Sequence, residues 1–121
     1  MPPPPIIDPI ALKNLQELSP DDGGVFFRDI VGIFLADTPL RIAELEESFR
    51  SADAPKVTRA AHSIKGSSAN LGADRLRAVA ERVERESQDK PIAQLAPILA
   101  EVREEFALAR DELQRILAVG L

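Results

Sequence analysis

The only histidine of the chain, His62, lies in a segment with a helical pattern, and its imidazole is the side chain best suited to chemistry. A neutral imidazole is a good nucleophile near neutral pH and can accept a phosphoryl group. Lys65 follows one turn later and Gly66 comes next, although glycine inside a helix costs about 0.5–1 kcal/mol relative to alanine. The pattern predicts an accessible imidazole beside a cation, which suits phosphoryl transfer because that reaction needs in-line access and charge neutralisation.

Other uses of a histidine find less support in the sequence. A catalytic triad is not expected, since the chain has no cysteine and no serine or acid evidently oriented beside His62. A metal site is not expected either, because one histidine without a carboxylate at i+4 is not a ligand set.

The helical wheel predicts that His62 points outward. Apolar residues of the segment 54–71 lie within about 40° of the side opposite the imidazole. These residues are Val57, Ala60, Ile64 and Leu71. They must face the core of a helical domain, so the imidazole faces solvent.

The outward face around His62 carries charge and little bulk. Arg59 and Lys65 lie about 60° to either side of the imidazole, where two cations can stabilise a doubly charged anion. Gly66 and Ala69 lie just C-terminal to the ring and leave room for a partner.

Each of these features also has a purely structural interpretation. An outward histidine on a helix is usually a solvated residue. Small residues such as Gly66 and Ser67 allow helices to pack closely, and Arg59 and Lys65 fit ordinary surface charge.

Apolar periodicity predicts an all-α fold of five helices, four of them long. Their expected ranges are 9–18, 25–51, 54–71, 74–86 and 91–119. Short loops favour antiparallel neighbours, so we expect an up-and-down four-helix bundle with the short N-terminal helix as a lid. Residues 1–7 are rich in proline and are expected to be a flexible lead to a single domain, residues 8–121.

Two prolines complicate the helical pattern. Pro39 interrupts the segment 25–51, which is therefore either one kinked helix or two helices, the second capped by Thr38. We favour one helix, because the apolar phase continues past the proline. Pro97 is expected to bend or delay the first turns of the last helix.

Composition excludes several classes of function. The 121 residues carry a net charge of −5, and an acidic chain binds nucleic acid poorly because neutralising phosphates dominates that affinity. The aromatic residues are five phenylalanines, without the tyrosine or tryptophan that base-stacking surfaces usually use. No apolar run is long enough to span a membrane, and the lack of cysteine fits a reducing compartment such as the cytoplasm.

The segment HSIKGSSANLGA, residues 62–73, resembles the signature of histidine-containing phosphotransfer (HPt) domains. That signature is a histidine, two residues, Lys-Gly, small residues and then Leu-Gly-Ala. Weaker resemblance covers residues 7–121, including the Ile-Asp-Pro opening and the Glu105-Phe106 pair in the last helix.

The resemblance implies a four-helix bundle in which His62 receives a phosphoryl group from an aspartate of one receiver domain and passes it to another. It implies that Lys65 neutralises the phosphoryl group, that Gly66 leaves access and that Ser67 hydrogen-bonds nearby. It also implies a monomeric carrier that is not an enzyme and has no cofactor of its own. The receiver, in a response regulator or hybrid kinase, would supply the magnesium and the aspartate.

Family receivers dock on an apolar patch beside the histidine, and the chain offers a candidate. Phe26, Ile33 and Leu40 recur every seven residues, about 100° from the core stripe of their helix, and Ala69 and Asn70 could complete the surface. Alternatively, the short first helix covers Phe26 and Ile33.

Two other functions remain open at this stage. One is a docking or inhibitory module that binds receiver or kinase domains without relaying phosphate, and the intact His-Lys-Gly core argues against it. The other is an enzyme with His62 as general base, which we rank last because the sequence lacks supporting carboxylates.

Overall fold

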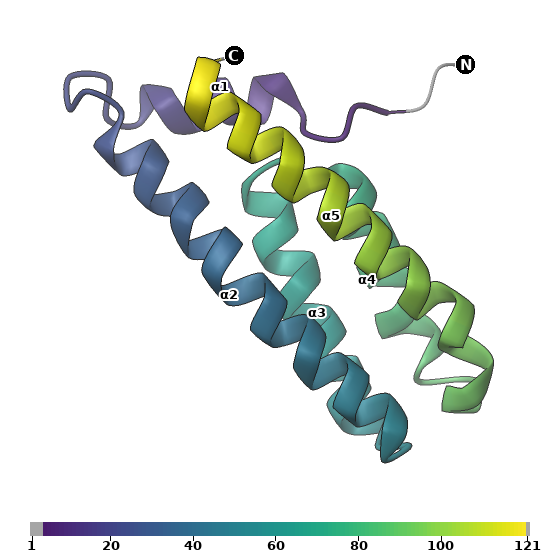
Figure 1. Ribbon diagram of the computed structural model, residues 1–121. Coiled ribbons are helices and arrows are strands. Elements are labelled where there is room, and N and C mark those ends of the chain that lie inside the picture. The colour runs from purple at the N-terminus through teal and green to yellow at the C-terminus, as the bar shows by residue number, and fades with distance from the viewer. Residues whose placement is uncertain (1–3, 121) are drawn as a thin grey trace.

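The computed structural model describes residues 4–120 and is helical throughout, with no strand in that range. Its elements are α1 (Pro9–Glu17), α2 (Val25–Arg50), α3 (Ala54–Asn70), α4 (Asp74–Glu86), a 3₁₀ turn η1 (Ile92–Leu95) and α5 (Ala96–Val119). The four long helices run up and down in turn, and α1 lies across one end of the bundle (Figure 1). The expected all-α bundle with a short N-terminal lid is confirmed.

Aspartate side chains accept hydrogen bonds from the first turns of three helices, and two of these aspartates are the N-cap residues. Asp8 accepts a hydrogen bond from the backbone N–H of Ile10 at 2.9 Å, and Asp53 accepts one from Lys56 at 3.2 Å. Asp22 accepts from the N–H of Phe26 at 2.9 Å and so serves α2. Each bond satisfies a backbone donor that the first turn of a helix leaves free.

Pro39 lies inside α2, which continues through it as one helix. The expectation of a single helix is therefore confirmed, and Thr38 is a fully buried helical residue rather than the cap of a second helix. Pro97 has the predicted delaying effect on the last helix. The chain first forms the η1 turn, and α5 begins next to Pro97, where a missing N–H costs no hydrogen bond.

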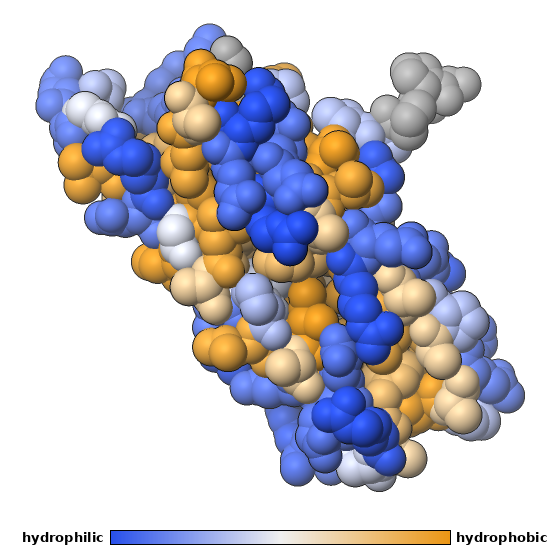
Figure 2. Space-filling model, in the orientation of Figure 1, coloured by the Kyte–Doolittle hydropathy of each residue, from blue (hydrophilic) through white to orange (hydrophobic). Residues whose placement is uncertain are grey.

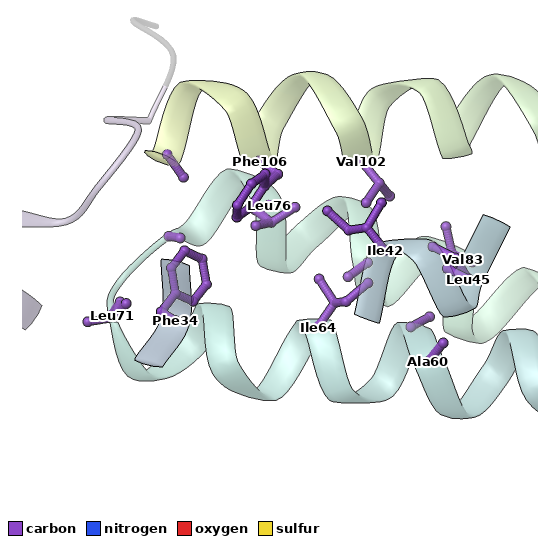
Figure 3. Packing of buried hydrophobic residues seen from close by; sticks show 14 of the residues in the cluster. Phe34, Ile42, Leu45, Ala60, Ile64, Leu71, Leu76, Val83, Val102 and Phe106 are labelled. Carbon is purple, nitrogen blue, oxygen red and sulfur yellow. The ribbon is translucent and has the colours of Figure 1, made fainter. Parts of the chain in front are cut away.

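The core runs the length of the bundle between the four long helices (Figure 3). Phe34 of α2 and Phe106 of α5 meet there with ring centroids 5.9 Å apart. Leu45, Ile64, Leu76 and Val83 are 0–1% exposed and fill the space between the helices. This burial of apolar surface stabilises the bundle and fixes which face of α3 is left outside.

Charged pairs and an apolar seam join α5 to its neighbours. Arg75 and Arg82 of α4 reach Glu105 and Glu101 of α5 at 2.9 and 3.1 Å. Figure 2 shows the α2–α5 face, where apolar residues follow the seam between the two helices and charged residues flank it. These ion pairs contribute to the packing of the bundle, because both arginines contact carboxylates of the neighbouring helix.

The lid is attached to the turn that ends α3. The N–H of Asp8 donates to the carbonyl of Gly72 at 2.8 Å, Ile7 is 6% exposed, and Ile6 packs against the core. The flexible lead predicted for residues 1–7 was thus too long, because its last two residues belong to the bundle. Residues 1–3 of that lead lie outside the described range.

Over residues 4–120, none of the helices combines the length and the apolar character needed to cross a membrane.

Candidate functional site

His62 lies in the middle of α3 and points out of the bundle. Its side chain is 67% exposed, whereas Val57 and Ile64 on the opposite side of the helix are fully buried and Ala60 is 6% exposed. The outward direction predicted from the helical wheel is confirmed. Packing of the apolar face of α3 against α2 and α4 holds the backbone below the imidazole.

A carboxylate from the neighbouring helix holds the ring. Glu84 of α4 lies 2.6 Å from Nδ1 of His62 through Oε2 and 2.6 Å from Nζ of Lys65 through Oε1. The carboxylate is 17% exposed, Lys65 is 28% exposed, and the imidazole is the outermost of the three groups. Glu84 therefore fixes the ring and the ammonium group together.

The charge of Glu84 decides which ring nitrogen carries the proton. The hydrogen bond from Lys65 is the main cause that lowers the pKa of Glu84, and the one from His62 adds to it, so the group is a carboxylate at neutral pH. An ionised carboxylate only accepts hydrogen bonds, so Nδ1 must donate. In the neutral ring the lone pair then lies on Nε2, the nitrogen that Glu84 leaves free to act as a nucleophile.

Sequence reasoning missed Glu84, and the interpretation that no acid lies beside His62 was wrong. A signal for it exists in the numbering. The turn between α3 and α4 covers residues 71–73, and His62 and Glu84 lie at similar distances on either side of its centre, 10 and 12 residues from Gly72. Antiparallel helices joined by a short turn bring such residues opposite each other.

The two cations predicted beside the ring have different surroundings. Lys65 is paired with Glu84, whereas Arg59 has no acidic partner within 4 Å among residues 4–120. Arg59 lines a hollow of about 670 Å³ between the C-terminal half of α2 and the start of α3, together with Glu44 and Glu47. Glu84 therefore holds Lys65 near the imidazole, whereas Arg59 lines the adjacent groove.

The face C-terminal to His62 is open. A Cβ added to Gly66 would meet no atom within 4 Å, and Ala69 and Asn70 are exposed. Ser67 directs its hydroxyl back to its own helix, where it donates to the carbonyls of Ser63 and Ile64 at 3.1 and 3.3 Å. The hydrogen bond of Ser67 is thus to the backbone and not to the imidazole.

The predicted apolar ridge of α2 lies on the surface beside this open face. Ile33 and Leu40 are 63% and 61% exposed, and Phe26 is half-buried, so the lid leaves Ile33 uncovered. Ile33 and Asn70 border one hollow of about 120 Å³ between α2 and α3. The other residues of this hollow are Ile30, Phe34, Asp37, Ser67 and Leu71.

Residues 4–120 contain no group of three histidine, cysteine, aspartate or glutamate side chains placed to hold a metal ion. The expectation that magnesium binds on a partner stays a prediction.

Comparison with known proteins gives one consistent result. The family model described as the Hpt domain matches residues 29–118. The chain is 33% identical over 79 residues to the multistep phosphorelay regulator 1 of Schizosaccharomyces pombe, covering 65% of this chain and 27% of that protein. It thus spans about a quarter of the length of this relative.

Solved structures share the fold. The maize histidine-containing phosphotransfer protein ZmHP2 superposes with a TM-score of 0.82 at 31% identity, covering 93% of this chain and 83% of that one. The Saccharomyces cerevisiae histidine phosphotransfer protein Ypd1, solved with the receiver domain of its downstream response regulator Ssk1, gives a TM-score of 0.86 at 20% identity. That comparison covers 98% of this chain and 99% of the other.

Proposed function

The chain belongs to the Hpt domain family, and on that premise we propose that it carries phosphoryl groups in a phosphorelay, with His62 as the acceptor. The observation that supports this most directly is the bond of Nδ1 to Glu84, which leaves the exposed Nε2 with its lone pair. The donor is the aspartyl phosphate of one receiver domain and the next acceptor is an aspartate of another.

The residues around the ring suit such a carrier. Lys65 can neutralise charge on the phosphoryl group, and the empty space over Gly66 lets a partner approach in line with Nε2. The chain needs no catalytic centre of its own in this proposal. The receiver brings the aspartate and the magnesium that balances the charge of the acyl phosphate.

A receiver domain is the partner that this surface fits best. Exposed Ile33 and Leu40 give an apolar contact next to the helix that carries His62, and the hollow beside Ile33 can take one apolar side chain. Ypd1, which shares the fold, is known in complex with a receiver domain. We propose that a monomer of this chain meets its receivers in the cytoplasm.

A panel of phosphorylated receiver domains tests the function. Rapid transfer of label from at least one receiver is expected, and the adduct should be acid-labile and base-stable, as a phosphohistidine is. His62→Gln should abolish labelling while circular dichroism stays helical, because the imidazole makes no core contact.

The same panel separates the relay from the alternative docking module. Labelling of the His62→Gln variant at the parental level would overturn the assignment of the acceptor. Receivers that bind the chain tightly without transferring label would instead support a docking or inhibitory role.

A further inference from the structure

We propose that the groove between the C-terminal half of α2 and the start of α3 selects the receiver domain by its pattern of charge. Glu44 and Glu47 of α2 form the acidic rim of this groove. Lys56 and Arg59 of α3 form its basic rim. The groove thereby favours a receiver with basic side chains over α2 and acidic side chains over the start of α3. Since the receiver is the partner in the proposed function, this selection rests on that function.

The groove is much larger than the hollow beside Ile33 at the other end of the α2–α3 surface. It measures about 670 Å³, against about 120 Å³ for that hollow. Small side chains form its floor, where Ala60 and Ser48 are 6% and 4% exposed. Ser63 also borders it and is the chain neighbour of His62. Several side chains of a partner bound at the imidazole can therefore enter between the charged rims.

The charges on the two rims are exposed and make only weak pairs within the chain. Glu44 and Glu47 pair with arginines three residues away on their own helix, and their side chains stay 57% and 68% exposed. Lys56 lies 3.8 Å from Asp53, and Arg59 has no acidic partner within 4 Å in the described part of the chain. Exposed ion pairs within one helix contribute little to stability and are screened by salt. The rims are therefore available to the charges of a partner.

The groove lies close enough to His62 to be covered by a receiver docked there. A specific interface buries about 800 Å² on each partner, which as a disc has a radius of about 16 Å. Arg59 and Lys56 lie three and six residues before His62, or about 4.5 and 9 Å along the axis of α3. The acidic rim lies across the groove on the neighbouring helix, and packed helices are about 8–10 Å apart. A receiver centred on the imidazole therefore covers both rims.

Two rims of opposite charge distinguish partners more sharply than a patch of one sign. Complementary charges raise the association rate and fix the register of docking, whereas like charges brought together oppose binding. A receiver with the matching pattern is attracted at both rims, and a receiver with the reversed pattern is repelled at both. The net charge of −5 cannot make this distinction, because it attracts any basic surface. The rims therefore select by the arrangement of charge and not by its total.

The test exchanges the two rims without changing the total charge. The exchanged variant combines Glu44→Lys, Glu47→Lys, Lys56→Glu and Arg59→Glu. Two acids become bases and two bases become acids, so the net charge stays at −5. The second-order rate constant for transfer from each phosphorylated receiver of the panel is measured for the parent and for this variant. The receivers that serve the parent best should lose about tenfold or more, and those with the reversed charge pattern should gain.

Salt and single substitutions separate the groove from surface charge in general. The differences should shrink between about 50 mM and about 500 mM salt, because exposed charges are screened. Arg59→Glu alone should slow the best receiver about fivefold. Arg110→Glu makes the same change of charge on α5, at a side chain that is 46% exposed, and should transfer as the parent does. Phosphoramidate, a donor too small to cover the groove, should label His62 in the parent and in the exchanged variant.

Unchanged transfer rates in the exchanged variant would overturn the inference and assign the groove to a partner other than a receiver. A loss in Arg110→Glu equal to that in Arg59→Glu would overturn it as well, since position in the groove would then not matter. Both results leave transfer to the parent intact. They are therefore distinct from failure of the relay itself, in which no receiver labels the parent.

Discussion

Gly66 and Gly72 lie within two turns of each other at the end of α3, yet the structure uses them in opposite ways. Gly72 has a φ of +70°, and a Cβ there would lie 2.6 Å from the Cβ of Ala11 in the lid. Gly66 has helical geometry, and a Cβ there would touch nothing within 4 Å. The fold requires the first glycine and would be more stable without the second.

The difference separates two regions of the molecule. Around Gly72, the turn, the lid and the core depend on one another, because Asp8 bonds to the carbonyl of Gly72 beside the buried Leu71. Around Gly66, the surface is open and adds little to folding. A residue that costs stability and touches nothing inside the chain is best explained by something outside it, here an approaching receiver domain.

The largest effect should come from a substitution in the region around Gly72. Gly72→Ala forces a left-handed backbone on alanine and pushes its Cβ into the lid, so we expect a loss of about 3 kcal/mol in the free energy of unfolding. Urea denaturation measures it. Gly66→Ala is the control and should raise the stability by about 0.5–1 kcal/mol. Equal effects of the two changes would contradict the division between the regions.

The second effect concerns the open surface. Ile33→Ser removes an apolar side chain that is 63% exposed, so folding should hardly change. Binding of a receiver should weaken by about 1–2 kcal/mol, or roughly 5–30-fold in Kd, because that side chain is buried only in the complex. Titration calorimetry with the receiver that transfers label best would measure it. Val119→Ser, at the far end of α5 and 72% exposed, should bind as the parent does.

A third change crowds the approach to the ring. Gly66→Leu should slow phosphoryl transfer by about tenfold or more, which corresponds to about 1.4 kcal/mol in the barrier. The same change should leave the free energy of unfolding unchanged or raise it slightly, since leucine favours helix and the space over Gly66 is open. Rapid-quench transfer assays give the rate. Ala100→Leu places the same leucine side chain at an exposed position of α5, and a slowing equal to that of Gly66→Leu would count against the access argument.

Much of this division could be predicted from the sequence. Local rules gave the caps Asp8 and Asp53 and the stop at Gly72, because each depends only on the backbone nearby. The period of the apolar residues placed His62 outside, since the core-facing side of an amphipathic helix determines the opposite side.

The features that the sequence did not predict depend on contacts between different helices or segments. Glu84 reaches His62 only through the register of α3 against α4, so periodicity within either helix does not reveal it. Burial of Ile6 and Ile7 likewise depends on where the lid docks and not on their proline-rich surroundings. The pattern within one helix predicts which of its faces is buried, whereas the residues that contact each face are determined by how the helices pack together.

The smallest effect tests how little the open region contributes to folding. Lys65 is the main cause that lowers the pKa of Glu84 in the folded chain. A lowered carboxyl pKa stabilises the fold above the unfolded-state value near 4.5, and this stability is lost as the pH falls through the folded-state value. Lys65→Ala should therefore reduce stability at pH 7 by about 1 kcal/mol or less and hardly at all at pH 3.

Urea denaturation at both pH values measures the difference, and Lys90→Ala, which breaks the more exposed pair with Glu86, should show a smaller one. A loss at pH 7 as large as that of Gly72→Ala would show that the site supports the fold as strongly as the lid turn does, and the two glycines would no longer mark different regions.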